Sequence, residues 1–195
     1  MAPRKVVLQM HTTLDGFADS KDGFVPIEDR SYWKDLEQAF AETGASEVDT
    51  LLMGKGTYKQ FVSFWPKVAT DPAAPNDWKA QAKFLDGAPK VIFSKTLPTA
   101  NWNKSTIVRG DVTREIARLK RRPGKNMLVP GGVEFPRALI ELDLVDEYLL
   151  SVVPTIVGQN RNRLFGPLPR QRSLSHVRSW TFRNGVTLHQ LRRAK

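Results

Sequence analysis

The chain has 195 residues, of which 41% are hydrophobic and 26% are charged, and its formal net charge is +10. This length and composition predict a single domain, residues 1–195, with a real hydrophobic core. Cysteine is absent, which excludes disulfides, thiolate catalysis and cysteine metal sites.

The chain shows no targeting or membrane signal. Charged residues interrupt every apolar run before it reaches membrane-spanning length. The opening MAPRKVVLQMH lacks the apolar centre and cleavage site of a signal peptide. We therefore expect a cytoplasmic protein with no membrane partner.

The first half of the chain alternates strand-like and helix-like segments. The patterns predict, in order, a buried strand over 4–11, a loop over 15–26, a helix over 31–44, a strand over 49–54 and a helix over 55–65. Residues 70–89 are proline-rich at their start and predict a loop with a short helix.

The second half continues the alternation and then changes. It predicts strands over 90–96 and 105–109, a helix over 111–124 capped by Asp111, a strand over 126–130, a helix over 132–144 and a long strand over 146–158 in which Pro154 marks a bulge or an edge. Strands over 174–183 and 186–193 follow, joined at Asn184-Gly185, a strong hairpin signal.

This order predicts an α/β fold with a mainly parallel sheet, closed at one edge by an antiparallel hairpin. In such sheets, ligands bind beyond the carboxyl ends of the strands. Three strand ends carry suitable residues, and each has a plainer explanation as a turn.

The first strand end is Gly54-Lys55-Gly56-Thr57, where a helix begins and its free N–H groups favour a phosphate. The second, Ser94-Lys95-Thr96, offers two hydroxyls around a cation. The third is Gly131-Gly132, whose backbone could approach a pyrophosphate or another chain segment. Each signal is weak alone, but three on one predicted sheet point to a phosphorylated ligand.

Other chemistry is poorly supported. His11, His176 and His189 lack metal-ligand spacing, so we expect no metal site. No nucleophile elbow occurs. Asp15 in TTLDG is a candidate carboxylate, although an Asp before Gly commonly forms a turn.

The segments TTLDGFAD, DTLLMGKGTY, VIFSKTL, VPGGVEFPRALIELDLVDEYLLSVVPTIVG and RLF span nearly the whole chain. In this order they resemble the dihydrofolate reductase-like superfamily. The resemblance is closest to the C-terminal reductase domain of bacterial riboflavin-biosynthesis deaminase-reductases. It implies a three-layer fold with helices on both sheet faces, and an NADPH-dependent reductase.

The resemblance also implies residue roles. Gly131 and Gly132 would lie against the cofactor pyrophosphate, and Lys55 and Thr57 would bind phosphates. Ser94, Lys95 and Thr96 would hold the 2′-phosphate of NADPH, with a smaller contribution from Arg109. Thr13 would lie near the nicotinamide, and the loop 15–26 would cover it. Asp15, His11 and an ordered water are the candidate proton donors.

Two departures from the family pattern matter, one at the cofactor site and one for the substrate. Lys55 stands where the family often has Arg, which keeps the charge but loses the two-pronged hydrogen bonding. Pro130 stands where the riboflavin reductases commonly have Glu. With no deaminase domain alongside, this argues against the riboflavin pathway, so we expect a small heterocyclic or carbonyl substrate of another kind.

Two alternative functions remain. The chain has no Asp or Glu from Tyr148 onward, so a basic nucleic-acid-binding module is one alternative. In it, Arg178, Trp180 and Phe182 would share a strand face as stacking platforms. No known nucleic-acid motif is present and both aromatics suit a core, so we do not expect nucleic acid. The other alternative is a non-catalytic dinucleotide-binding protein. Either way, the edge strands and the 146–158 segment would allow a homodimer.

Overall fold

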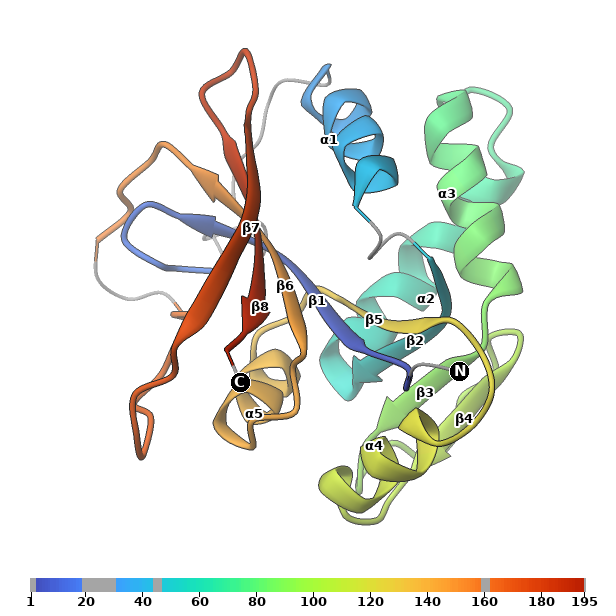
Figure 1. The fold of residues 1–195 in the computed structure, drawn as a ribbon. Coiled ribbons are helices and arrows are strands. Elements are labelled where there is room, and N and C mark those ends of the chain that lie inside the picture. Colours follow the sequence, from blue (N-terminus) through green and yellow to red (C-terminus); the bar gives the residue numbers. More distant parts are fainter. Residues whose placement is uncertain (1–2, 19–30, 44–46, 159–161, 195) are drawn as a thin grey trace.

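The computed structural model describes residues 3–18, 31–43, 47–158 and 162–194 (Figure 1). The elements in chain order are β1 (Val6–Thr13), α1 (Ser31–Glu42), β2 (Val48–Gly54), α2 (Lys55–Thr70), α3 (Asn76–Gly87), β3 (Lys90–Phe93), β4 (Ser105–Val108), α4 (Val112–Lys120), β5 (Asn126–Pro130), α5 (Glu134–Glu141), β6 (Glu147–Val153), β7 (Leu174–Thr181) and β8 (Thr187–Arg193). No helix among these residues is long and apolar enough to cross a membrane.

The strands form one sheet in the order β4-β3-β2-β5-β1-β6-β8-β7. Neighbours from β4 to β6 pair in parallel. β8 then pairs antiparallel with both β6 and β7. The predicted mainly parallel sheet with a C-terminal antiparallel hairpin is therefore confirmed. Because the parallel strands share a direction, the carboxyl ends of β3, β2, β5 and β1 meet at one edge.

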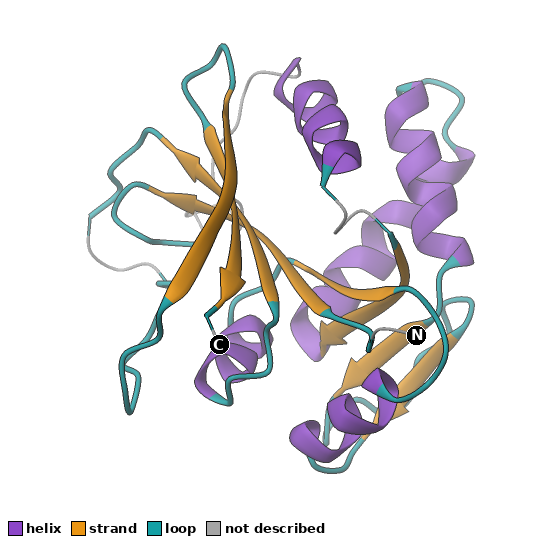
Figure 2. Cartoon of the chain, viewed as in Figure 1, coloured by secondary structure: helices purple, strands orange, loops and turns teal. Residues whose placement is uncertain are grey.

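Helices cover both faces of the sheet (Figure 2). On one face, α1, α2 and α3 contribute Leu36, Tyr58 and Leu85 to a buried cluster. On the other face, Ile116 of α4 and Leu139 of α5 join a second cluster. Alternate residues of β1 enter the two clusters, because successive side chains of a strand point to opposite faces. The predicted three layers are thus present.

The segment after β2 is more helical than its sequence predicts. We expected a helix ending at Trp65, but α2 continues through Pro66 to Thr70. Helix α3 is also a full 12 residues, where a short helix in a loop was expected. Trp65 packs against Trp78 of α3 with ring centroids 6.4 Å apart, so the two helices contact each other next to Pro66.

Strand β6 ends at Val153, directly before Pro154, rather than continuing to residue 158. Proline lacks the N–H that a further sheet hydrogen bond would need. The predicted hairpin turn, which lies next to Pro154, is confirmed. Gly185 has φ +81°, and its N–H donates to the Phe182 carbonyl. The Asp111 cap is confirmed as well, since its carboxylate accepts from the Arg114 N–H.

Candidate active site

The first turn of α2 joins two of the three predicted phosphate-binding segments. Lys55 Nζ donates to Thr96 Oγ1 at 2.8 Å, which links it to the loop after β3. On the other side, a Cβ on Gly132 would clash with the Thr57 hydroxyl. The structure therefore brings the ends of β3, β2 and β5 together, because β2 lies between β3 and β5 in the sheet.

Gly131 and Gly132 both adopt left-handed backbone conformations, with φ of +96° and +87°. Side chains rarely occupy this region. Gly132 leaves room for the Thr57 hydroxyl, whereas a Cβ on Gly131 would meet no atom within 4 Å. Gly132 thus permits close packing of two chain segments, and Gly131 borders open space that a ligand could reach.

The loop after β3 is organised by its own polar groups. Ser94 Oγ accepts hydrogen bonds from the N–H groups of Thr96, at 3.2 Å, and Leu97, at 2.9 Å. The Arg109 guanidinium donates to the carbonyls of Lys95, at 3.1 Å, and Leu97, at 2.8 Å. Lys95 remains exposed. Arg109 therefore holds the loop in shape, and the Lys95 ammonium is left facing solvent.

Helices α2 and α5, which begin at this edge, differ in the charge of their first turns. The first turn of α2 contains no acidic residue, and its cap Gly54 provides no side-chain acceptor. The first turn of α5 contains Glu134. Since a helix N-terminus carries partial positive charge, the α2 start is the better site for an anion.

The end of β1 is tied to the segment after β6. Thr13 Oγ1 donates to Asp15 at 2.6 Å, and the Gly158 N–H donates to the same carboxylate at 2.9 Å. The Thr13 hydroxyl, aided by the N–H groups of Gly158 and Val157 and opposed by burial, lowers the pKa of Asp15. Asp15 is therefore ionised near neutral pH and holds two loops together; a catalytic role for it stays a prediction.

Burial lowers the pKa of His11, which precedes Thr13 by two residues, to about 4. The imidazole is thus neutral near pH 7. The loop predicted to cover the nicotinamide begins at Asp15, but its residues 19–30 lie outside the described residues.

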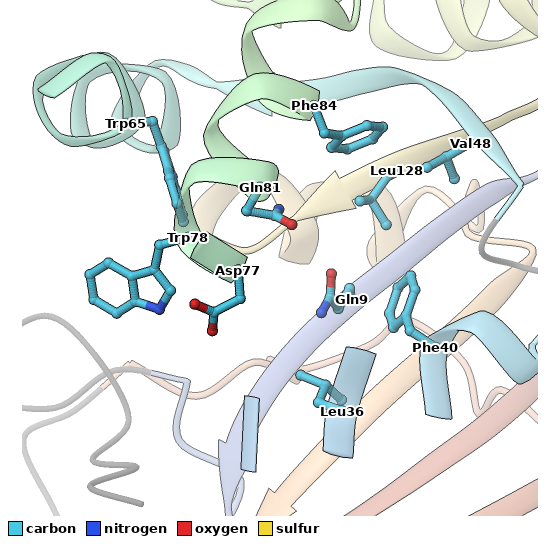
Figure 3. A pocket seen from close by; sticks show the side chains of 10 residues that line it. All are labelled: Gln9, Leu36, Phe40, Val48, Trp65, Asp77, Trp78, Gln81, Phe84 and Leu128. Carbon is cyan, nitrogen blue, oxygen red and sulfur yellow. The ribbon is translucent and has the colours of Figure 1, made fainter. Parts of the chain in front are cut away.

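A cavity of about 300 Å³ lies between the sheet and helices α1 and α3 (Figure 3). The sequence patterns do not predict this cavity. Its floor includes Gln9 of β1 and Leu128 of β5, two strands of the predicted ligand edge. A polar Gln inside the apolar run of the first strand was the one local signal. The walls come from helices distant in sequence, which no local pattern reveals.

Two further sequence predictions can be compared with the described residues. No three His, Cys, Asp or Glu side chains come together there as a metal ion would need. Of the suggested stacking platforms, Phe182 is only 9% exposed and belongs to the core. The Arg178 guanidinium lies over the Trp180 ring at 4.8 Å and pairs with Glu42 at 2.9 Å. The expectation that the protein does not bind nucleic acid stays a prediction.

Known proteins are similar to this chain over nearly its whole length. Protein YyaP of Bacillus subtilis (strain 168) is 28% identical over 185 residues, covering 94% of this chain and 92% of YyaP. A crystal structure of a Shewanella sp. PV-4 protein named for riboflavin biosynthesis has a TM-score of 0.68 at 21% identity, covering 98% and 99% of the two chains.

Dihydrofolate reductase from Enterococcus faecalis, solved with NADP(H), has a TM-score of 0.62 at 10% identity, covering 98% of this chain and 97% of its own. The predicted dihydrofolate reductase-like fold is therefore confirmed. The model of the RibD C-terminal domain family matches residues 4–188. The chain belongs to the RibD C-terminal domain family.

Proposed function

We propose that the protein is an NADPH-dependent reductase that transfers a hydride to a small heterocyclic or carbonyl substrate. The observation that carries the proposal is the first turn of α2, which contacts the Thr96 loop through Lys55 and the Gly132 turn through Thr57. These three segments form a row of polar groups along the edge of the sheet. An elongated ligand with phosphates at several points matches such a row. The family and the fold of the relatives support the same reading.

The residues present fit the cofactor. Lys55 and the N–H groups of the α2 first turn suit a pyrophosphate, and the open space over Gly131 lets a phosphate approach the backbone. Ser94, Lys95 and Thr96 suit a terminal phosphate monoester, which accepts several charge-assisted hydrogen bonds. Thr13, at the end of β1, would border the nicotinamide.

When bound, NADPH supplies the hydride from its nicotinamide ring. The side chains at the end of β1 then position the nicotinamide and the substrate and keep bulk water out, rather than react themselves. Asp15 is held as a carboxylate and His11 is neutral, so neither is a good acid near pH 7. We therefore assign proton delivery to an ordered water.

The test is calorimetric titration of the whole chain with NADPH and NADH. Lys95→Ala should weaken NADPH and leave NADH unchanged, because only NADPH carries the 2′-phosphate. Lys55→Ala should weaken both. One charge-assisted hydrogen bond contributes about 1.5–3 kcal/mol, which corresponds to roughly 10- to 100-fold in Kd.

Lys125→Ala is the matched control. Lys125 is an exposed lysine that immediately precedes β5, at the opposite edge of the sheet. It should leave both affinities unchanged. Equal losses in all three variants, or no binding of either dinucleotide to the wild type, would sink the proposal. Substrate-dependent oxidation of bound NADPH separates a reductase from a non-catalytic dinucleotide-binding protein. A cytoplasmic location, consistent with the absence of cysteine, belongs to the same proposal.

A further inference from the structure

The connection between β3 and β4, residues 94–104, begins with the Ser94-Lys95-Thr96 segment of the candidate cofactor site. It leads to β4, which lies at the edge of the sheet beside β3. Connections at a protein surface are commonly more mobile than the strands that they join. Here two cations bind backbone carbonyls of the connection, one near each end, and so hold it in one conformation.

Arg109, directly after β4, holds the start of the connection. Its guanidinium donates to the Lys95 carbonyl at 3.1 Å. It also donates to the carbonyls of Leu97, at 2.8 Å, and Pro98, at 3.2 Å. A guanidinium is planar and donates in fixed directions, so it fixes these three carbonyls relative to one another. Arg109 therefore determines the point from which the Lys95 side chain extends.

The same segment is also held from within. Ser94 Oγ accepts hydrogen bonds from the N–H groups of Thr96 and Leu97, which engage both of its lone pairs. The Leu97 side chain is buried in the core cluster on the α2 and α3 face of the sheet. Lys95, in contrast, is exposed. The segment therefore presents the Lys95 ammonium to solvent from a fixed backbone.

A buried ammonium holds the far end of the connection. Lys90, the first residue of β3, is 0% exposed, and its Nζ donates to the carbonyls of Asp86, at 3.0 Å, and Ala88, at 2.8 Å. It also donates to the Asn103 carbonyl at 2.9 Å, so all three ammonium donors are satisfied. Nζ lies 4.4 Å from the centroid of the Trp102 ring. Burial lowers the pKa of Lys90 to about 8, which leaves the group mainly protonated at pH 7.

Trp102 joins this far end to the first turn of α2. Its backbone N–H donates to the hydroxyl of buried Tyr58 at 3.1 Å. Tyr58 directly follows Thr57 in α2, where the pyrophosphate is proposed to bind. This contact does not involve Arg109. Loss of the Arg109 guanidinium should therefore release residues 95–98 while the α2 first turn keeps its contact with the connection.

We propose that Arg109 is a positioning residue that sets the selectivity for NADPH over NADH by fixing the backbone at Lys95, which contacts the 2′-phosphate. The inference rests on the proposed function and adds a residue that controls its cofactor selectivity. The family resemblance implies a direct, smaller contribution of Arg109 to the 2′-phosphate, whereas the geometry commits its guanidinium to three backbone carbonyls. A held lysine binds more tightly than a mobile one, because ordering a segment on binding costs free energy.

The test is a double-mutant cycle on the whole chain, with NADPH and NADH affinities measured by calorimetry at pH 7. Arg109→Met should lower the preference for NADPH about fivefold or more and leave the NADH affinity nearly unchanged. The double variant with Lys95→Ala should show the preference of Lys95→Ala alone, because Arg109 acts only through Lys95. Losses that multiply would mean that Arg109 contacts the phosphate independently, and would overturn the inference.

Two further variants separate positioning from charge. Arg109→Lys keeps the charge but lacks the planar fork, so its preference for NADPH should fall nearly as far as that of Arg109→Met. A preference retained in Arg109→Lys would overturn the inference. Arg118→Met is the matched control, since Arg118 lies in the last turn of α4 and pairs with Glu115. It removes the same charge and should leave the preference unchanged.

Amide hydrogen exchange tests the positioning without any cofactor. In Arg109→Met, the Thr96 and Leu97 amides should exchange faster, while the Trp102 amide, held by Tyr58, should not change. Equal changes at all three amides would overturn the inference. A wild type that prefers NADPH while the two losses multiply refutes the role of Arg109 and leaves the reductase proposal standing. A wild type that binds neither dinucleotide refutes the reductase proposal, and the selectivity role with it.

Discussion

At the scale of single residues, the adjacent glycines Gly131 and Gly132 have different roles. Both have positive φ, but only Gly132 lies against another side chain, that of Thr57. The sequence predicted that the backbone at this pair approaches a ligand or another chain segment closely, but it did not identify which. The two tasks separate because the neighbours of the two backbone positions come from elsewhere in the chain.

Alanine at each glycine should distinguish them. Gly131→Ala should lower the free energy of unfolding by about 1–2 kcal/mol, from backbone strain alone. Gly132→Ala adds a clash with the Thr57 hydroxyl and should lower it by about 2–5 kcal/mol. Gly131→Ala should nevertheless weaken NADPH, since its methyl group enters the open space. Denaturant unfolding and NADPH titration measure both effects; equal stability losses would contradict this account.

At the scale of elements, local patterns predicted which segments are helices and strands better than where they end. Trp78, Ala82 and Leu85 have the spacing of one helix face, and Ala82 and Leu85 are buried. The nearby prolines hid this pattern. Pro75 in fact occupies the cap position of α3, and Pro66 lies inside α2. Packing between α2 and α3 outweighs the helix-breaking tendency of a proline. The sequence alone does not reveal this packing.

Glu147, at the start of β6, ties three strands through one buried carboxylate. It accepts from Gln190 of β8 at 2.5 Å, from Lys5 next to β1 at 3.2 Å and from Arg192 at 3.3 Å. Burial raises the pKa of Glu147, but hydrogen bonds from Gln190 and Lys5, with the charges of Lys5 and Arg192, outweigh burial and lower it.

This lowered pKa predicts the pH dependence of stability. A carboxylate whose pKa is lower when folded stabilises the fold above its unfolded value of 4.5 and loses that contribution as pH falls through its folded value. Glu147→Gln should therefore lower the free energy of unfolding by about 1–2 kcal/mol at pH 7. Denaturant unfolding between pH 7 and strongly acidic pH should show this difference shrinking below 4.5. A difference that stays constant or grows would contradict the prediction.

At the scale of the whole molecule, the candidate site depends on strand order. Because β2 lies between β3 and β5, residues 55, 96 and 132 meet at one edge although they are far apart in the chain. The antiparallel β7–β8 pair lies at the opposite end of that order from β4. The homodimer expected from the edge strands stays a prediction.

Because the candidate cofactor site lies at this edge, NADPH binding there should stabilise the fold. At a free concentration of 100 times its Kd, it should raise the free energy of unfolding by about 2.7 kcal/mol. For a chain of this length that is a rise in Tm of about 5–10 °C. Hydrogen exchange should slow most at the carboxyl ends of β2, β3 and β5, beyond the general slowing that global stabilisation causes. Slowing no greater there than in β7, or none, would contradict the assigned site.

The sequence by itself determined the alternation of strands and helices and the closing hairpin, and it marked three strand ends as candidates for binding phosphate. These depend on side-chain periodicity and turn chemistry, which act between near neighbours along the chain. Only the tertiary structure decided that Lys55 meets Thr96, that Thr57 meets Gly132, and that α1 and α3 enclose a cavity with the sheet. Those contacts join residues far apart in sequence, and their formation depends on how whole elements pack.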